Sequence, residues 1–384
     1  MERADFLALD DLLTEEQKLV RSSVREYVTR EIEPRIRMAY LQEDFLEDLP
    51  AGLGRLGVLG ANLEGYGLPG MDAVSYGLVM QELERCDSAV RSFASVQGAL
   101  VMYPIHTFGS EAQKAYWLPR LARGASIGCF GLTESQGGSD PGAMLTTATK
   151  LGSKWVINGS KMWITNGSIA EIAIVWARTE NGVRGFIVPT SQKGVTVRKM
   201  TGKLSLRASI TSELYFDQVE VEEDALLPHA LGMKAPLQCL TQARYGISWG
   251  VIGAAEACFQ EAISYVQDRK TFGKALSENQ LVQRKLALML TRISQAKLVA
   301  FRLGHLYASK KLHHSQVSLG KQANVEAALE IARMSRDLLG ANGIMIEYVS
   351  MRHMNNLETV FTYEGTNDIH LLILGSEITG KQAF

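Results

Sequence analysis

The chain has 384 residues, of which 46% are hydrophobic and 21% are charged, so it holds enough apolar material for a sizeable core and is not mainly disordered. At roughly 100–200 residues per domain, this length predicts two or three domains. The 40 lysines and arginines against 41 aspartates and glutamates give a net charge of −1, which argues against a protein whose main task is to bind nucleic acid.

Residues 12–125 show a helical pattern. Thr14 followed by two glutamates is typical of a helix start with an N-cap. Apolar residues then recur at three- and four-residue steps up to Ile32, and Pro34 is expected to end this helix. Further helices are predicted over 73–85 and 88–101.

Between residues 126 and 235 the period changes to that of strands. The run from Trp155 to Thr165 consists of two short strand-like stretches about Asn158-Gly159, which is a signal for a hairpin turn. Their spacing and turn residues are typical of an antiparallel sandwich or barrel. Further strands are predicted over 171–178, 185–189, 194–198 and 213–221.

The helical pattern returns from about residue 236. Long helices that form a four-helix bundle are predicted over 236–268, 277–308, 315–340 and 367–378. The fold is therefore predicted to be α+β and mostly α. Its predicted domains are an N-terminal helical domain over 1–125, a middle antiparallel β-sandwich or barrel domain over 126–235 and a C-terminal helix-bundle domain over 236–384.

The cysteines and the opening segment bear on the compartment. The four cysteines form no CxxC pair, which argues against a cysteine zinc site, and free buried thiols suit a reducing compartment. The first residues are acidic where a signal peptide needs a basic start. We expect a cytoplasmic protein, although a processed mitochondrial matrix chain would look the same. The longest uncharged stretch, 92–110, is typical of buried helix and turn, not of a membrane span.

The segment from Phe130 to Pro141 alternates glycines with small hydroxylated residues. Backbone N–H groups in such a loop can approach a ligand closely, and the hydroxyl groups add hydrogen-bond donors. The loop lacks the lysine of a Walker phosphate motif. Taken alone, such a loop is more often a surface loop with a turn at Asp140-Pro141.

Five motifs in order resemble those of the flavin-dependent acyl-CoA dehydrogenases. The run Gly131-Leu-Thr-Glu-Ser-Gln-Gly-Gly-Ser-Asp resembles the family's first signature. Trp163-Ile-Thr is similar to the strand that covers the flavin ring. The remaining motifs are Arg269-Lys-Thr-Phe-Gly with Gln280, Asp337-Leu-Leu-Gly-Ala-Asn-Gly, and Tyr363-Glu-Gly-Thr-Asn.

This resemblance implies FAD as the cofactor, a homotetramer and an electron-transfer flavoprotein as the electron acceptor. The segment that starts at Arg269 is implied to contact the flavin diphosphate across a subunit boundary. No nucleic acid or membrane partner is expected. The residues that the resemblance places at the cofactor are Phe130, Leu132, Thr133, Gly138, Ser139, Trp163, Ile164, Thr165, Arg269, Phe272, Gln280, Asp337, Leu338, Gly340, Ala341, Thr366 and Asn367.

Within the family, the stretch 83–97 resembles the acyl-pocket helix of the glutaryl-CoA dehydrogenases, as do 205–209, 243–246 and 378–384. Glutaryl-CoA is therefore the implied substrate. Gln242 departs from the pattern, because relatives carry Asp or Asn near this position. Arg244 is open between a contact to the CoA moiety and a helix cap. The residues implied to bind the substrate are Glu84, Arg91, Ser92, Ser95, Ser139, Leu240, Arg244, Tyr363 and Gly365.

Arg91 allows two interpretations from the residues themselves. Steps of seven and four place Glu84, Arg91 and Ser95 on one helical face, and a buried guanidinium needs an anion. The alternative is an ordinary Asp87–Arg91 pair on a solvated face, worth a few tenths of a kcal/mol. With the resemblance, the planar guanidinium is implied to bind the distal carboxylate of the acyl chain, oriented by Glu84.

Glu364 also has two interpretations. It can be a solvated residue of a turn in which Thr366 or Asn367 caps the next helix. The resemblance instead implies that it is the catalytic base, with a pKa raised by burial between flavin and thioester. Glu364 is then implied to remove the proton alpha to the thioester carbonyl while flavin N5 takes the beta hydrogen, with the backbone N–H of Glu364 among the donors to the thioester oxygen.

Tyr363 and Glu84 match the decarboxylating members of the family. The implied product is crotonyl-CoA with release of CO2, through a dienolate that Glu364 reprotonates. The alternatives are a dehydrogenase of another short or branched acyl-CoA, a glutaryl-CoA dehydrogenase that does not decarboxylate, and a non-catalytic acyl-CoA or flavin-binding protein. His313-His314 resembles a metal tract, but the lysines and serine around it favour a solvated loop, and we expect no metal site.

Overall fold

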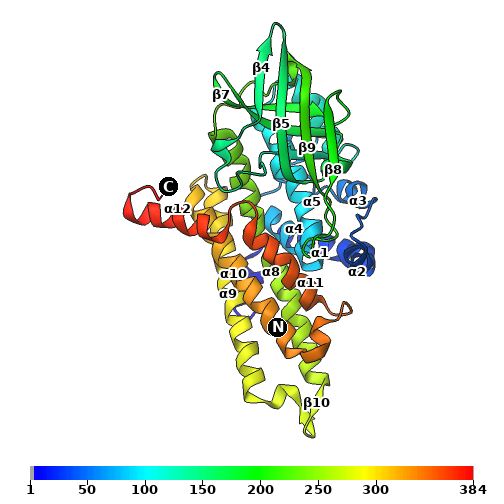
Figure 1. Ribbon diagram of the computed structural model, residues 1–384. Coiled ribbons are helices and arrows are strands. Elements are labelled where there is room, and N and C mark those ends of the chain that lie inside the picture. Colours follow the sequence, from blue (N-terminus) through cyan, green and yellow to red (C-terminus); the bar gives the residue numbers. More distant parts are fainter. Residues whose placement is uncertain (1–3, 384) are drawn as a thin grey trace.

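The computed structural model describes residues 4–383 and shows a helical region, a sheet and a second helical region in chain order (Figure 1). The sheet forms one end of an elongated molecule, and the long C-terminal helices extend to the other. Residues 1–3 of the acidic opening segment and Phe384 of the last motif lie outside the described residues. Among those described, no helix is both long and apolar enough to cross a membrane, and all four cysteines are buried free thiols.

The first helix begins where the sequence predicts and ends differently. Helix α1 (Glu15–Tyr27) starts after Thr14, whose side chain caps it. A π-helical turn, Val28–Ile32, continues directly into α2 (Glu33–Gln42). The prediction that Pro34 ends the helix is wrong, because Pro34 lies in the first turn of α2, where its missing N–H is not needed.

Two buried helices follow, α4 (Ala73–Cys86) and α5 (Ser88–Ser95), the second continuing as a π-helical segment, Val96–Met102. Asp87 separates them in an extended conformation, with φ −165° and ψ 142°. The single helical face predicted for Glu84, Arg91 and Ser95 is therefore wrong. These residues come from two helices, and the break turns them toward each other. The other N-terminal elements are α3 (Leu49–Leu56), β1 (Glu64–Gly65), β2 (Leu68–Pro69), α6 (Tyr103–Phe108) and α7 (Glu111–Ala122).

The middle region is a curled seven-stranded sheet in the order β3-β6-β4-β5-β9-β8, with β7 paired to β6. The predicted antiparallel pairing is present for most neighbours, whereas β3 and β4 run parallel to β6. Strands β3 and β4 are additions to the predicted set. The strands are β3 (Gly128–Gly131), β4 (Thr147–Leu151), β5 (Lys154–Thr165), β6 (Ile172–Thr179), β7 (Gly182–Pro189), β8 (Val195–Lys199) and β9 (Thr211–Glu222).

The hairpin predicted about Asn158-Gly159 is wrong. Strand β5 runs without a turn through both residues, and its register against β9 shifts there, which marks a β-bulge. Gly159 has a φ of 143°, and a Cβ at this position would lie 2.5 Å from Thr146 Oγ1. The glycine is needed for a close approach of β5 to the segment before β4, not for a turn. A second register shift occurs near Trp163, which has a φ of 63°.

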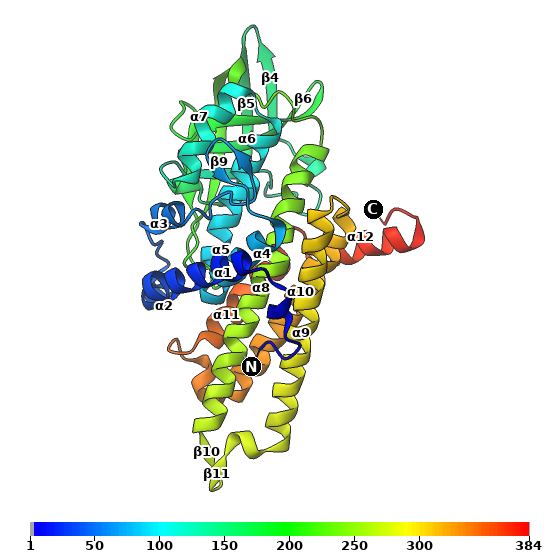
Figure 2. The same cartoon turned by 180° about the vertical axis from the view of Figure 1, so that it is seen from behind.

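The C-terminal region is built on long helices. Helix α8 packs against α4 on one side and α10 on the other, and the predicted helix over 367–378 extends outward from α10 (Figures 1 and 2). Helix α11, which the sequence analysis did not predict, packs against α8 and α10. The elements are α8 (Lys234–Asp268), β10 (Lys270–Thr271), β11 (Lys274–Ala275), α9 (Gln280–Ala308), α10 (His314–Leu338), α11 (Val349–Thr362) and α12 (Asn367–Thr379).

Candidate active site

The site is centred on the turn 363–366 between α11 and α12. Thr366 caps α12 by accepting a hydrogen bond from the Ile369 N–H at 3.2 Å, as one interpretation of the sequence proposed. Glu364 is not the solvated residue of that interpretation. Its Oε2 atom is buried and has no hydrogen-bond partner among residues 4–383. A buried, unpaired carboxylate oxygen at this point is free to accept a proton.

The electrostatics of the turn favour a protonatable Glu364. Burial raises its pKa, while the positive charges of Arg91, Arg244 and Lys321 act in the opposite direction without cancelling the effect. A carboxyl group whose pKa moves upward toward neutral pH is better matched to the work of a general base. The geometry and the pKa direction are both those expected for the predicted base.

Arg91 and Glu84 form a fully buried ion pair across the break between α4 and α5. Arg91 Nε lies 2.6 Å from Glu84 Oε2, and both side chains are 0% exposed. The guanidinium also donates to the Tyr363 hydroxyl through Nη2, beside the Glu364 turn. Its third nitrogen, Nη1, is buried and unpaired within the part of the chain that the structure describes. Burial is the largest single influence and opposes the charge of Arg91, but Glu84, Tyr363 and Glu364 together outweigh it and raise the pKa of Arg91.

The alternative Asp87–Arg91 pair is wrong. Asp87 instead forms an ion pair with Arg352 of α11, accepts from Asn356 at 3.0 Å and caps α5 through the Ala89 N–H. Asp87 thus pairs with residues of α11, and Glu84 is the carboxylate that pairs with Arg91. The partners of Asp87 on α11 are more than 260 residues away in the sequence, so helical spacing alone does not reveal them.

Small residues and hydroxyl groups surround this ion pair. Gly250 of α8 faces it so closely that a Cβ there would lie 2.2 Å from Glu84 Oε2. Ser92 and Ser95 are both buried, and the Ser95 hydroxyl oxygen has no hydrogen-bond partner in the described chain. Together with Arg91 Nη1, the Ser95 hydroxyl forms a set of unused donors, which is what a buried anion requires.

Arg244 and Gln242 have roles that the sequence left open. Arg244 lies inside α8, so it caps no helix, and its Nε donates to the carbonyl oxygen of Glu364 at 2.7 Å. Gln242 accepts from the Tyr307 hydroxyl of α9 at 2.7 Å. Leu240 is partly buried against the core, at the same stretch of α8. The CoA contacts predicted for Leu240 and Arg244 stay predictions.

The predicted flavin loop is anchored by a buried ion pair that the sequence analysis missed. Lys161 of β5 lies 2.8 Å from Glu134, which also accepts from the N–H groups of Leu145 and Thr146. Burial opposes the charge of Glu134, but hydrogen bonds from Lys161 and Thr146 lower its pKa to about 2. The Met162 N–H donates to Thr133 O at 2.9 Å, which ties the loop to β5. The alternating pattern of β5 was the available signal, since Lys161 takes an inward position.

The surface beside this loop fits a flat, polar-edged cofactor. Trp163 exposes 56% of its surface although it belongs to a central strand, and Gly138 has open space on its side-chain side with respect to the described atoms. Thr133 and Thr165 are partly exposed and offer hydroxyl groups. Phe130, Leu132 and Ile164 are buried under this surface, and Ser139 is exposed. An exposed indole beside hydroxyl donors and glycines is suited to an isoalloxazine ring.

The other predicted cofactor residues lie elsewhere. Phe272 is fully exposed at the tip of the β10–β11 hairpin, at the far end of the molecule from the sheet, with Arg269 and Gln280 beside it in the chain (Figure 1). Asp337 borders a cavity of about 560 Å³ between α10 and α11. Leu338 ends α10, Gly340 and Ala341 belong to the following 3-10 turn, and Asn367 begins α12. Within residues 4–383, the predicted cofactor residues of the β10–β11 hairpin therefore lie at the opposite end of the molecule from those beside the sheet.

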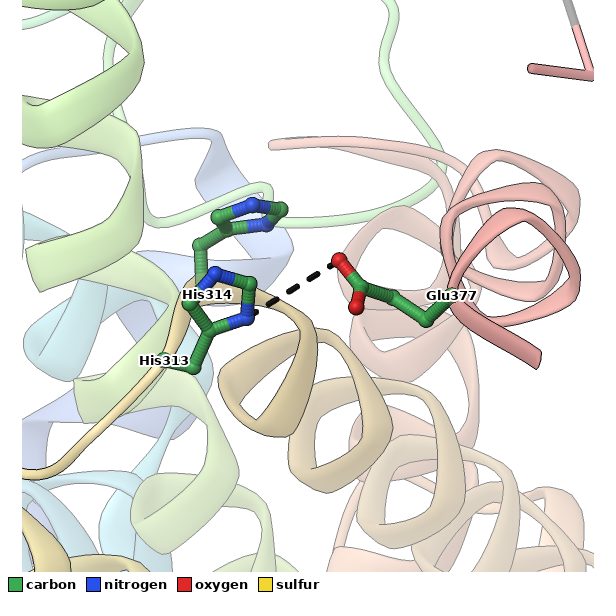
Figure 3. A group of neighbouring side chains, drawn as sticks. All are labelled: His313, His314 and Glu377. Atoms are coloured by element: carbon green, nitrogen blue, oxygen red, sulfur yellow. Dashed lines mark ion pairs between the residues drawn. The ribbon is translucent and has the colours of Figure 1, made fainter. Parts of the chain in front are cut away.

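His313 and His314 approach Glu377 of α12 (Figure 3). His313 Nδ1 lies 3.9 Å from the Glu377 carboxylate and 2.7 Å from Ser315 Oγ. All three side chains of the group are exposed. The arrangement is that of a surface pair joining the start of α10 to the end of α12, and we assign it no part in the reaction.

The comparison with protein families covers most of the chain. The acyl-CoA dehydrogenase N-terminal, middle and C-terminal domains match residues 14–125, 129–219 and 231–379. Acyl-CoA dehydrogenase of Bacillus subtilis (strain 168) is 36% identical over 375 residues, which are 96% of this chain and 99% of that protein. The human mitochondrial short-chain specific acyl-CoA dehydrogenase is 32% identical and covers 95% of this chain and 90% of its own length.

Solved structures agree with the family. Two structures of glutaryl-CoA dehydrogenase from Mycobacterium smegmatis are 49% and 48% identical with TM-scores of 0.98 and 0.99, each covering 100% of this chain and 99% of the other, and the second is in complex with FADH2. A glutaryl-coenzyme A dehydrogenase in complex with glutaryl-CoA is 30% identical with a TM-score of 0.92, covering 97% of each chain. The chain therefore belongs to the acyl-CoA dehydrogenase family, and it is an enzyme that uses FAD as its cofactor.

Proposed function

We propose that this enzyme oxidises glutaryl-CoA at the alpha,beta bond and releases crotonyl-CoA and CO2. The observation that carries the substrate assignment is the free Nη1 of Arg91, a buried guanidinium nitrogen with no hydrogen-bond partner in residues 4–383. Leaving a buried charged donor unpaired is costly, and a carboxylate at the end of an acyl chain would satisfy it. The likeness to glutaryl-CoA dehydrogenases at 48–49% identity supports the same substrate.

Arg91, Glu84 and Glu364 have separate roles in the proposed reaction. Arg91, held by Glu84, binds the distal carboxylate and fixes the position of the acyl chain. Glu364 accepts the proton alpha to the thioester carbonyl on its free Oε2. In this proposal its backbone N–H donates to the thioester oxygen. The FAD, held by the surface around Trp163 and Thr165, supplies the acceptor for the two electrons and the beta hydrogen.

Loss of CO2 follows from the product of that oxidation. In glutaconyl-CoA, the carbon that bears the distal carboxylate is conjugated through the new double bond to the thioester. The carbon–carboxylate bond can therefore break with its electron pair passing toward the thioester oxygen. Protonated Glu364 then returns its proton to the chain and gives crotonyl-CoA. Tyr363 lies between Arg91 and Glu364, and its match to the decarboxylating members supports this second step.

The test is turnover of the purified, FAD-loaded enzyme on glutaryl-CoA, butyryl-CoA and isovaleryl-CoA, with mass-spectrometric identification of the products. We expect a preference for glutaryl-CoA, with crotonyl-CoA and CO2 in equal amounts. A preference for a monocarboxylic chain would refute the substrate assignment. Accumulation of glutaconyl-CoA without CO2 would keep the substrate and replace decarboxylation by the non-decarboxylating alternative, which uses the same Arg91 site.

We propose further that a second copy of the chain completes the FAD site and that the assembly is a homotetramer. The support is the distance between the two groups of predicted cofactor residues, one beside the sheet and one at the bundle tip. An electron-transfer flavoprotein is the proposed electron acceptor. The buried free cysteines are in keeping with the proposed cytoplasmic location.

A further inference from the structure

The base-bearing turn has an unfavourable backbone. Glu364 has a φ of 53° and Gly365 a φ of 99°, so two successive residues adopt conformations with positive φ. Glycine tolerates this readily, but a glutamate does not. Such a conformation persists only where the surrounding structure holds it. A Cβ at Gly365 would also be crowded, because it would lie 3.0 Å from His370 Nε2.

Two buried cations from different helices bind the two successive carbonyl groups of this turn. Arg244 of α8 donates through Nε to Glu364 O at 2.7 Å. Lys321 of α10 donates through Nζ to Gly365 O at 2.8 Å, and Lys321 is only 1% exposed. A lysine is rarely buried to this degree unless a specific partner holds it. Its partners here are the carbonyl oxygen of Gly365 in the turn, 44 residues away, and at 3.5 Å that of Phe361 at the end of α11.

We propose that Lys321 is a positioning residue, which with Arg244 fixes the carbonyl groups of residues 364 and 365 and so holds the Glu364 carboxylate in its reactive orientation. This role rests on Glu364 being the base, which is part of the proposed function. It does not depend on which acyl chain is the substrate. Lys321 does not itself contact the reacting atoms.

The charge of Lys321 adds a second effect on the base. Glu364 in the turn, Arg244 on α8 and Arg91 on α5 influence the pKa of Lys321. Lys321 in turn acts on His370 of α12. Burial lowers the pKa of Lys321 to about 7, against the attraction of Glu364. Burial also lowers the pKa of His370 to about 3, so His370 is neutral near pH 7 and adds no charge there. Removing the positive charge of Lys321 therefore raises the pKa of Glu364 further.

The test measures proton abstraction directly. Acetyl-CoA has protons alpha to its thioester but no beta carbon, so it cannot be dehydrogenated, and exchange of its alpha protons in D2O on the FAD-loaded enzyme follows the base alone. We compare Lys321→Met, which removes the donor and the charge, with Lys321→Gln, which keeps an N–H donor without the charge. The matched control is Lys297→Met, a partly buried lysine of α9 that pairs with Glu256 at 2.6 Å.

We expect Lys321→Met to slow exchange about tenfold or more, because a displaced base loses its alignment. The acid limb of the pH profile should move upward by about one unit. Lys321→Gln should recover part of the rate but keep the shifted acid limb. Lys297→Met should lower thermal stability without moving that limb.

Wild-type exchange rate and acid limb in a folded Lys321→Met protein would overturn the proposal, and so would losses that match those of Lys297→Met. A wrong assignment of Glu364 as the base would be detected by a separate variant. In that case Glu364→Gln would keep the exchange activity. Failure of the glutaryl-CoA assignment leaves this experiment unaffected, because acetyl-CoA has no distal carboxylate.

Discussion

Arg91 carries the acyl selectivity if its free nitrogen binds the distal carboxylate. Arg91→Met keeps much of the side-chain volume and removes the charge. We expect kcat/KM for glutaryl-CoA to fall about 100-fold or more, since a buried hydrogen-bonded charge pair is lost, and that for butyryl-CoA to change little. The measurement is the ratio of the two kcat/KM values. An equal loss on both substrates would refute carboxylate binding by Arg91.

Removing Arg91 alone leaves Glu84 as an uncompensated buried charge, which costs about 3–5 kcal/mol of stability. The control must therefore remove the charge of Glu84 as well. The double variant Glu84→Gln with Arg91→Met removes both charges. It should recover much of the thermal stability lost by Arg91→Met and keep the changed substrate ratio. Recovery of glutaryl-CoA selectivity in the double variant would show that the single variant acted through misfolding.

Glu364 gives a prediction in which stability and activity move in opposite directions. Its folded-state pKa is raised, so the native state holds the proton more tightly than the unfolded state, and the contribution of this group to stability falls as pH rises through the window between the two pKa values. Above that window the carboxylate is charged, and its burial is costly. Glu364→Gln should therefore raise the melting temperature at pH 7, with a smaller gain at pH 4, while turnover is abolished. Calorimetry at both values checks the sign, and an equal gain at both would contradict it.

At the scale of elements, the break between α4 and α5 and the facing surface of α8 shape the acyl pocket together. Gly250→Ala adds a methyl group that would lie 2.2 Å from Glu84 Oε2, so the ion pair must move. We expect kcat/KM for glutaryl-CoA to fall about tenfold and the value for butyryl-CoA to fall less. Gly375→Ala on α12 is the matched control, because its added methyl would meet open space with respect to the described atoms. Similar losses in both variants would contradict a role for Gly250 in placing Glu84.

Local patterns predicted most elements but not the irregular points that build the site. The period of apolar residues places α8, α9 and α10 within a few residues, because each buries one continuous face. The hairpin prediction at Asn158-Gly159 was wrong because the same dipeptide suits a β-bulge as well as a turn. Only the close approach of the segment at Thr146 distinguishes the two. Lys321 was missed although it stands four residues from both Val317 and Val325, on the buried face of α10. A charged residue at an apolar position was the signal.

The whole molecule separates the predicted cofactor residues beside the sheet from Arg269 and Phe272 at the β10–β11 hairpin. If a second copy completes the site, the tip must bind a partner. Phe272→Asp, at a fully exposed position, should then lower the oligomeric state and release most of the FAD on gel filtration. Light scattering and the ratio of flavin to protein absorbance are the measurements. Leu151→Asp, exposed on β4, is the control, and unchanged assembly and FAD content in Phe272→Asp would contradict the proposal.

The motifs predicted the residues of the candidate site, but the sequence did not reveal the contacts that these residues make. Glu84 and Arg91 are seven residues apart and were expected to interact, but through a continuous helix that does not exist. The partners Arg352 of Asp87 and Lys321 of the base-bearing turn come from other parts of the chain. Long-range pairs of this kind depend on how α8, α10 and α11 pack, which no local pattern contains.

The contacts between α11 and Asp87 have a consequence for redesign of the substrate site. Arg352 and Asn356 attach α11 to Asp87 at the break between α4 and α5. The same helix ends at the turn that holds Tyr363 and the predicted base. The segment proposed to bind the distal carboxylate and the turn proposed to carry the base are thus joined through α11. If α5 is replaced by the corresponding helix of a relative to change the accepted acyl chain, the new break after α4 loses its matched contacts with α11. A successful exchange must therefore replace α5 and α11 together.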